Sequence, residues 1–202
     1  AAVRYQEALT AARDKLLTRI DALTPAQLRL TDDELQEKDP ETQFLVRAAR
    51  RRGLVARLEI AAVISASHNQ DPAFDEWSDR AKVEARVERF KNPLVHREPT
   101  RSDPLAILCV KSMLLTGFDA PVEQVMYVDR FMQGADLLQA IARVNRTATG
   151  KTCGLVVDYY GIGRHLHDAL AVYTDADVEG VATDISDELP RLRDRHAAAL
   201  DL

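Results

Sequence analysis

The sequence predicts an α/β protein in which helices cover both faces of a parallel β-sheet, a three-layer arrangement. Short, continuously apolar segments rich in Val, Ile and Leu recur along the chain, as expected of strands buried on both faces. Amphipathic helical stretches separate these segments, and strands that alternate with helices generally form parallel sheets. The 202 residues suffice for one such domain or slightly more.

The first third of the chain is mainly helical in this prediction. Apolar residues recur there at helical spacing, and turn-forming residues interrupt the pattern. In order, the pattern predicts a helix at 2–21, a break at Thr24-Pro25, an acidic polar segment at 31–41, a helix at 42–53 ending at Gly53, and a buried strand at 58–65.

The rest of the chain alternates strands and helices. Its clearest strand signals are three short apolar runs, which lie within 105–157. In order, the pattern predicts a loop at 66–78, a helix at 79–91, a Pro-rich loop at 92–104, strands at 105–110, 124–128 and 153–157, and helices at 135–146, 163–173 and 183–199.

Composition limits the possible partners and compartments. The net charge is −5, whereas a domain that binds nucleic acid by itself is more often basic, so any such contact must be local or shared. No apolar run approaches the ~20 residues of a membrane span, and no secretory signal is recognisable; we expect a cytoplasmic protein without membrane contact. Cys109 and Cys153 lie in apolar segments without metal-ligand spacing, which favours buried, reduced thiols and no metal site.

One predicted helix carries a group of polar side chains suited to an anion. Gln139, Arg143 and Arg146 follow an i, i+4, i+7 spacing, which places them within about 60° of one another on a helix. Two Arg forks on one face match phosphate geometry. The competing interpretation is an amphipathic helix with a solvated polar face.

A second group of polar residues follows the predicted strand at 105–110. Thr116, Gly117 and Asp119 form a Thr-Gly-Phe-Asp segment, and parallel sheets bind ligands at the carboxyl ends of their strands. Gly117 permits close backbone approach, and Asp119 supplies an acceptor. The simpler alternative is a turn with a helix cap at Asp119.

A basic cluster lies near the end of the helix predicted at 42–53. It consists of Arg47, Arg50, Arg51, Arg52 and Arg57. Such a cluster can neutralise nucleic-acid phosphates. Pairing with the acidic segment at 31–41 is the favoured interpretation.

Together these segments resemble motifs V and VI of superfamily 2 helicases. More narrowly, LLTGFDAP at 114–121, LLQAIARVNR at 137–146 and GLVVDYYG at 154–161 resemble the motor (R) subunit of type I restriction enzymes, in order and at that family's spacing. The resemblance runs from about residue 2 to 195 and is strongest at 105–161. Ala142 stands where many helicases have Gly, a departure that the type I motors tolerate.

The resemblance implies a RecA-like (P-loop NTPase-type) fold, namely the second motor lobe of a DNA translocase. Residues 1–178 would form the lobe without its first strand, and 179–202 a C-terminal helix leading to a helical region. By the motif match, Arg143 and Arg146 would be catalytic arginine fingers. Gln139, Gly117 and Asp119 would line the ATP site, and Ser112 and Thr116 would contact DNA.

The resemblance also implies cofactors and partners. ATP and Mg²⁺ would be held mainly by a first lobe of the same polypeptide, since the 202 residues contain no G-x-x-x-x-G-K-[ST] loop. This chain would then hydrolyse no ATP and cut no DNA by itself. Double-stranded DNA, a nuclease domain of the same polypeptide, and modification and specificity subunits would be its partners.

Two other functions are consistent with the same residues. One is a lobe of another superfamily 2 helicase, acting on RNA or in repair. The other is a non-enzymatic α/β domain that binds an anion through Arg143 and Arg146. The sequence upstream of Ala1 and the ATPase of Arg variants would separate the three.

Overall fold

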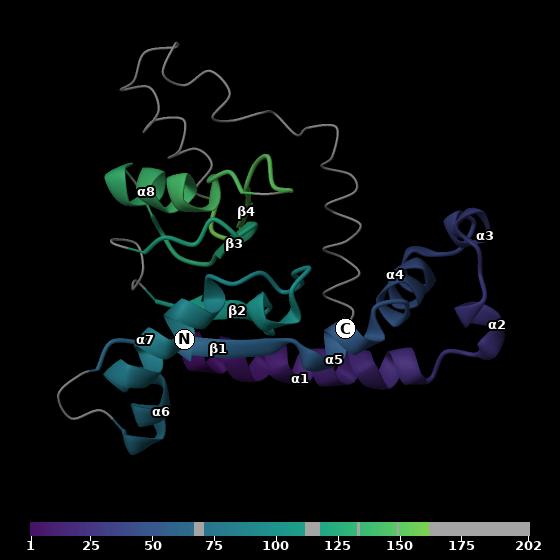
Figure 1. The fold of residues 1–202 in the computed structure, drawn as a ribbon, viewed down its shortest axis with the longest axis horizontal. Coiled ribbons are helices and arrows are strands. Elements are labelled where there is room, and N and C mark those ends of the chain that lie inside the picture. The colour runs from purple at the N-terminus through teal and green to yellow at the C-terminus, as the bar shows by residue number, and fades with distance from the viewer. Residues whose placement is uncertain (67–70, 112–117, 133, 149, 162–202) are drawn as a thin grey trace, which may run out of the picture. The chain divides into compact units, whose positions relative to one another are not determined.

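The computed structural model describes residues 1–66, 71–111, 118–132, 134–148 and 150–161 (Figure 1). Within these ranges the chain forms two compact units. One contains residues 4–60, and the other contains residues 1–3 and 61–161. The helices predicted at 163–173 and 183–199, and the segment 179–202, lie outside the described residues. No helix of the described ranges is long and apolar enough to cross a membrane.

The unit of residues 4–60 is helical. Its long first helix matches the prediction to the residue, and two short helices occur where only a break and an acidic segment were predicted. The helices are α1 (Ala2–Asp21), α2 (Pro25–Leu28), α3 (Asp32–Gln36), α4 (Pro40–Ala49) and α5 (Arg52–Arg57).

Capping boxes start the two short helices. The Thr24 hydroxyl accepts a hydrogen bond from the Gln27 backbone N–H, and the Gln27 side chain accepts one from the Thr24 backbone. Thr31 and Glu34 form the same reciprocal pair at the start of α3. This S/T-x-x-E/Q spacing is visible in the sequence and was the available signal for both helices.

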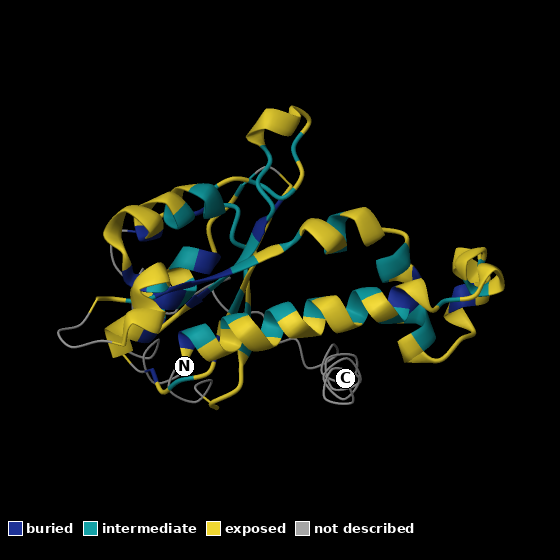
Figure 2. Cartoon of the chain, turned by 90° about the horizontal axis from the view of Figure 1, so that it is seen from below, coloured by how far each residue is buried: buried dark blue, intermediate teal, exposed yellow. Residues whose placement is uncertain are grey.

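A small core holds the short helices in place. α2 and α3 both pack against α4, and Leu35 and Val46 are completely buried there. In Figure 2 exposed residues recur along α1 between partly buried ones, the pattern of an amphipathic surface helix.

The helix predicted at 42–53 is wrong at both ends. Asp39 caps the N-terminus by accepting from the Thr42 backbone N–H at 2.9 Å, so α4 begins at Pro40. The chain leaves helical geometry at Arg51 (φ −118°, ψ 22°) and then forms α5. Gly53 therefore lies inside the first turn of α5 rather than at a helix end.

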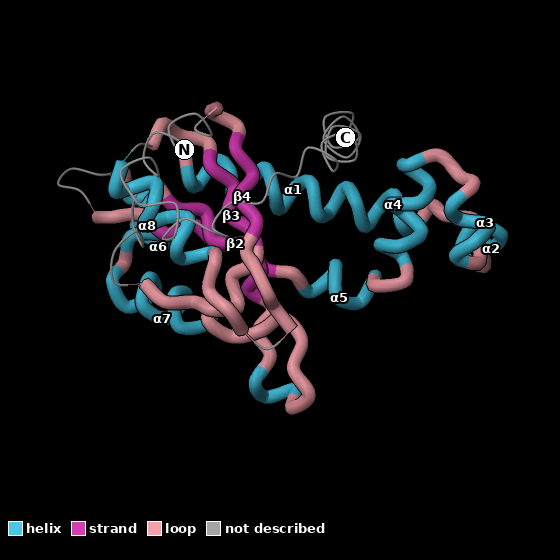
Figure 3. Tube along the Cα trace, turned by 90° about the horizontal axis from the view of Figure 1, so that it is seen from above, coloured by secondary structure: helices cyan, strands magenta, loops and turns pink. Residues whose placement is uncertain are grey.

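The second unit combines strands with helices (Figure 3). Strand β1 leads into it from the first unit, and the short helices η1 and α6 occupy part of the predicted loop at 66–78. Its elements are β1 (Glu59–Val63), η1 (Pro72–Phe74), α6 (Asp75–Ser78), α7 (Arg80–Phe90), η2 (Pro99–Arg101), β2 (Leu105–Val110), β3 (Val125–Val128), α8 (Gly134–Val144) and β4 (Leu155–Asp158).

The strands form two pairs rather than one sheet within the described ranges. β1 is hydrogen-bonded to β2, and β3 runs parallel to β4 with Val125 opposite Leu155. The α/β class is confirmed, whereas a single three-layer RecA-like sheet is not seen. Alternation along the sequence predicts the elements, but which strands pair depends on contacts between distant segments. Arg130 nevertheless links the ends of β3 and β2 by donating to the Lys111 carbonyl at 2.9 Å.

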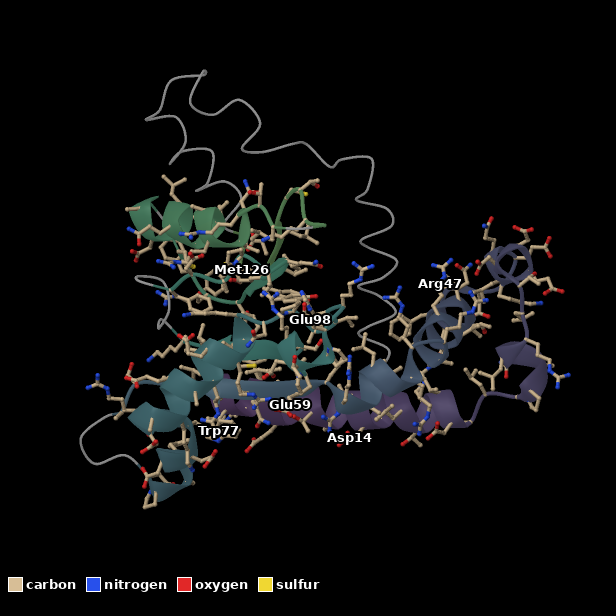
Figure 4. All side chains as sticks on the ribbon, viewed as in Figure 1. Asp14, Arg47, Glu59, Trp77, Glu98 and Met126 are labelled. Atoms are coloured by element: carbon tan, nitrogen blue, oxygen red, sulfur yellow. The ribbon has the colours of Figure 1, made fainter. Side chains whose placement is uncertain are left out.

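Helix α8 covers one face of the β3–β4 pair (Figure 1). Leu137 and Ala140 of α8 are completely buried and form a cluster with two residues of the β3 segment, Val128 and Met132. Met126, labelled in Figure 4, packs against this cluster from β3. The predicted apolar face of the helix is therefore the face that contacts the strands.

Helix α8 ends two residues earlier than predicted. Asn145 forms a turn after Val144, and its side-chain oxygen accepts from the Gly154 backbone N–H at 3.2 Å. A Cβ atom on Gly154 would lie 2.1 Å from the Val144 carbonyl oxygen. The segment before β4 thus passes directly over the helix end, and β4 begins at Leu155 rather than at Cys153.

Candidate functional site

The three polar residues of the predicted anion-binding face do not all lie on the helix. Gln139 and Arg143 are one turn apart on α8, where Gln139 is exposed and Arg143 half-buried. Arg146 lies beyond the helix end and is exposed. Its position is therefore set by contacts of the following segment and not by the helical spacing used in the prediction.

The structure brings Arg146 to Asp119. The Arg146 Nη1 atom lies 2.5 Å from the Asp119 Oδ1 atom. The two residues come from the two segments that sequence reasoning selected separately. The segment that contains Asp119 also includes three other predicted site residues. These lie outside the described residues and are Ser112, Thr116 and Gly117.

A buried lysine joins the same two segments. Lys151 is 7% exposed, and its ammonium donates to the Pro121 carbonyl oxygen at 3.0 Å and to the Glu123 carbonyl oxygen. Burial raises the pKa of the Glu123 carboxyl group, while the positive charges of Lys151 and Arg143 act in the opposite direction. Glu123, Arg143 and Lys151 thus interact electrostatically, and we refer to them and the Asp119–Arg146 ion pair of the same two segments as the cluster.

The cluster lies where β3 and β4 begin. Glu123 directly precedes this edge, and the Leu155 backbone N–H donates to the Gln124 carbonyl oxygen at 2.9 Å. The sequence placed the Thr-Gly-Phe-Asp segment at a carboxyl strand end. Of this segment the structure describes Phe118 and Asp119, and Asp119 precedes the turn that leads into the start of β3.

Comparison with known proteins identifies the region that contains this cluster. Residues 66–161 match the family described as type I restriction enzyme subunit R domain 3. The matched residues 66–161 are similar to this family and are called the subunit R region. All residues predicted for the ATP and DNA sites fall inside it.

Individual relatives agree with the subunit R match. The chain is 40% identical over 111 residues to the type I restriction enzyme HindI endonuclease subunit of Haemophilus influenzae, which covers 53% of this chain and 10% of that protein. It is 37% identical over 130 residues to the putative type I restriction enzyme MjaVIIP endonuclease subunit of Methanocaldococcus jannaschii, a match that covers 63% of this chain and 12% of that protein. It is 36% identical over 140 residues to the putative MjaIXP endonuclease subunit of the same organism, which covers 68% of this chain and 13% of that protein. The chain thus spans about a tenth of the length of these relatives.

Sequence reasoning missed two members of the cluster in the subunit R region. Lys151 and Glu123 carry no motif of their own, and both became visible only through the fold. A weak signal for Lys151 was present, since Gly150 marks a turn and adopts φ +79°. That turn reverses the chain and points the lysine back toward Pro121.

Asp158 has a local structural role in the subunit R region. Its side-chain oxygen accepts from the backbone N–H groups of Tyr160 and Gly161, both at 2.9 Å. Asp158, which ends β4, thus stabilises the turn that follows the strand.

The cysteines of the subunit R region differ from each other. Cys109 is buried, as predicted, and burial raises its pKa to about 11. Cys153 is exposed, so its prediction as a buried thiol is wrong. Its segment turns past the end of α8 before β4 begins, which leaves the side chain outside the core.

The basic cluster outside the subunit R match is partly neutralised by acids. Arg50 pairs with Asp32 of the acidic segment and also donates to the Leu30 carbonyl oxygen at 2.7 Å. Arg52 contacts Asp21 at 2.6 Å. The hydrogen bond from Arg50 lowers the pKa of Asp32. Acid pairing, the favoured interpretation, is confirmed for Arg50, and Arg52 uses an acid of α1 instead.

Proposed function

We propose that this chain forms the second motor lobe of a type I restriction enzyme R subunit, in which Arg143 and Arg146 act on ATP bound against another lobe. The subunit R match and the ordered motifs at 114–121, 137–146 and 154–161 support the proposal. The single observation that carries it is the 2.5 Å contact between Asp119 and Arg146, which joins two separately predicted motifs.

The geometry of this ion pair suits an exchangeable arginine. The side chains of Arg146 and Asp119 are 45% and 57% exposed, and ion pairs of such exposure contribute about 0–1 kcal/mol. Arg146 can therefore leave Asp119 for a multiply charged phosphate at little cost. Bidentate contacts between a guanidinium group and phosphate oxygens are stronger than contacts with one carboxylate oxygen.

The neighbouring residues would complete the nucleotide site. In this proposal Arg143 supplies a second positive charge from α8, and Gln139 holds the nucleotide or orients the fingers. Asp119 and Gly117 line the same cleft. Ser112 and Thr116 contact the phosphate backbone of DNA.

Hydrolysis in this scheme requires closure of two lobes. A first lobe of the same polypeptide holds ATP and Mg²⁺, and the fingers stabilise charge on the transferred phosphoryl oxygens when the lobes close. Closure couples the ATP cycle to stepping along double-stranded DNA. The nuclease domain of the same polypeptide then cuts DNA, and the modification and specificity subunits complete the enzyme.

The test is DNA-stimulated ATP hydrolysis by the complete R subunit assembled with its partner subunits. Arg143→Ala and Arg146→Ala should each reduce kcat by about 10³–10⁵, the usual contribution of an arginine finger. Binding of a fluorescent ATP analogue should change far less, because the first lobe holds the nucleotide.

Arg80→Ala is the matched control for these variants. Its side chain is 92% exposed and paired with Glu84 on α7, so turnover should not change. Unchanged turnover in both Arg143→Ala and Arg146→Ala would refute the proposed function.

A further inference from the structure

Lys151 is unusual because a lysine side chain is rarely buried. Only 7% of it is exposed, and an ammonium group taken out of water is costly unless hydrogen bonds replace its hydration. Here the carbonyl oxygens of Pro121 and Glu123 supply two acceptors. An apolar residue of similar length could fill the space but could not bind these oxygens.

The two carbonyl groups belong to the turn that follows Asp119. The Glu123 backbone N–H donates to the Ala120 carbonyl oxygen at 3.0 Å, which closes this turn. The lysine therefore holds the path of the chain directly after Asp119. It does so through main-chain atoms, so the contact is independent of the side chains in the turn.

The backbone of Lys151 is held against Ala148, two residues after Arg146. Lys151 and Ala148 exchange two main-chain hydrogen bonds, of 2.9 and 3.3 Å, in an isolated antiparallel bridge. Gly150 closes this turn with φ +79°, a left-handed conformation that favours glycine. Ala148 and Lys151 are therefore held side by side, and the buried lysine anchors the chain two residues after Arg146.

The segments that contain Asp119 and Arg146 thus contact each other at two places, one partly exposed to solvent and one buried. One is the half-exposed ion pair between these two residues, and the other is the buried contact of Lys151 with the turn carbonyls. The ion pair must open for Arg146 to reach a phosphate. The buried contact uses neither Arg146 nor Asp119, so it does not require the pair to be closed.

We propose that Lys151 is a positioning residue that holds the Arg146 segment against the Asp119 turn while Arg146 moves between Asp119 and a nucleotide phosphate. The inference rests on the proposed function of Arg146. Lys151 touches no nucleotide in this scheme and acts only through Arg146. Its removal leaves the finger present but misplaced, and misplacement by about 1 Å can cost about 10²-fold in rate.

The experiment is a double-mutant cycle in the complete R subunit assembled with its partner subunits. Lys151→Met keeps the length and apolar stem of the side chain and removes the ammonium group. It should lower kcat for DNA-stimulated ATP hydrolysis by about 10- to 100-fold and change ATP affinity by less than about threefold. In an Arg146→Ala background the same change should lower kcat no further.

Lys151→Arg is the conservative variant. It keeps a positive charge and N–H donors, but its head group is wider and planar. We expect a kcat between those of the wild type and Lys151→Met. If Lys151→Met does not fold, Lys151→Arg replaces it in the double-mutant cycle with Arg146→Ala. The lysine change should then lower kcat when Arg146 is present and lower it no further in the Arg146→Ala background.

The outcomes separate this inference from the proposed function. Equal losses from the lysine change with and without Arg146 would show a general structural role and overturn the inference, as would an unchanged kcat in Lys151→Met. If Arg146→Ala retains full turnover, the inference fails, and the proposed function fails as well only if Arg143→Ala also retains full turnover.

Discussion

Replacement of Gly154 by alanine should destabilise the unit of residues 61–161 more than the same change at Gly134, Gly150 or Gly161. The added Cβ atom would lie 2.1 Å from the Val144 carbonyl oxygen, 2.5 Å from its carbonyl carbon and 3.0 Å from the Asn145 nitrogen. All three are backbone atoms, so no side-chain rotation relieves the clash. The helix end and the β4 segment must separate.

The size of the effect follows from these distances. The 2.1 Å contact falls about 1.3 Å short of the 3.4 Å at which ordinary contact begins. A radial gap of 0.5–1 Å already forfeits a quarter to a half of a dispersion contact, and the displaced helix carries the completely buried Leu137 and Ala140. Overpacking typically costs about 1–3 kcal/mol, and we expect about 3 kcal/mol here because only backbone can yield.

Urea unfolding of the full chain measures this loss. The single tryptophan, Trp77, is labelled in Figure 4 and lies in the same unit, where Arg86 stacks on its ring at 4.6 Å. Its fluorescence therefore reports unfolding of that unit. With a denaturant slope of about 2 kcal/mol/M, the midpoint should fall by about 1.5 M.

Gly134→Ala is the control at the other end of α8. Gly134 has φ +54° but meets no atom within 4 Å of an added Cβ, so only left-handed backbone strain of about 1 kcal/mol applies. A Gly154→Ala loss no larger than that of Gly134→Ala would refute the steric reasoning.

Two further predictions concern titratable groups of the same unit. Burial raises the pKa of Asp103, but hydrogen bonds from Arg89 at 2.9 and 3.0 Å and from the Leu105 backbone N–H at 2.9 Å lower it more, and the net pKa lies below the usual value. Because the pKa of Asp103 is lower in the folded than in the unfolded protein, its ionisation stabilises the folded state above about pH 3.9, the unfolded-state pKa. This stabilisation is lost as the pH falls through the folded-state pKa. The unfolding free energy of Asp103→Asn should therefore fall less than that of the wild type between about pH 5 and 2 in urea titrations, and equal acid losses would contradict this. In thiol titration at pH 8, exposed Cys153 should react rapidly and Cys109, with its pKa of about 11, slowly; Cys153→Ser should remove the fast phase, and persistence of that phase would contradict the assignment.

Local signals in the amino-acid sequence suffice to predict several helices and strands. The predicted bounds of α1 and β2 match the structure, and those of α7, β3, α8 and β4 differ by one or two residues. Periodicity and apolar runs suffice there because each element is stabilised by one buried face. The two motif segments and their family resemblance were likewise readable from local residue order. The capping boxes of α2 and α3 were local signals too, but the prediction did not use them.

Which of these segments meet depends on long-range contacts that local patterns do not specify. The contact of Asp119 with Arg146 joins residues that are distant in sequence, and Arg146 owes its position to the turn after α8 rather than to helical spacing. The burial of Lys151 and its binding to two turn carbonyls had no pattern in the sequence. The close passage of Gly154 over the end of α8 was equally hidden. Local patterns specify which residues can be buried or charged, whereas such contacts depend on the paths of segments far apart along the chain.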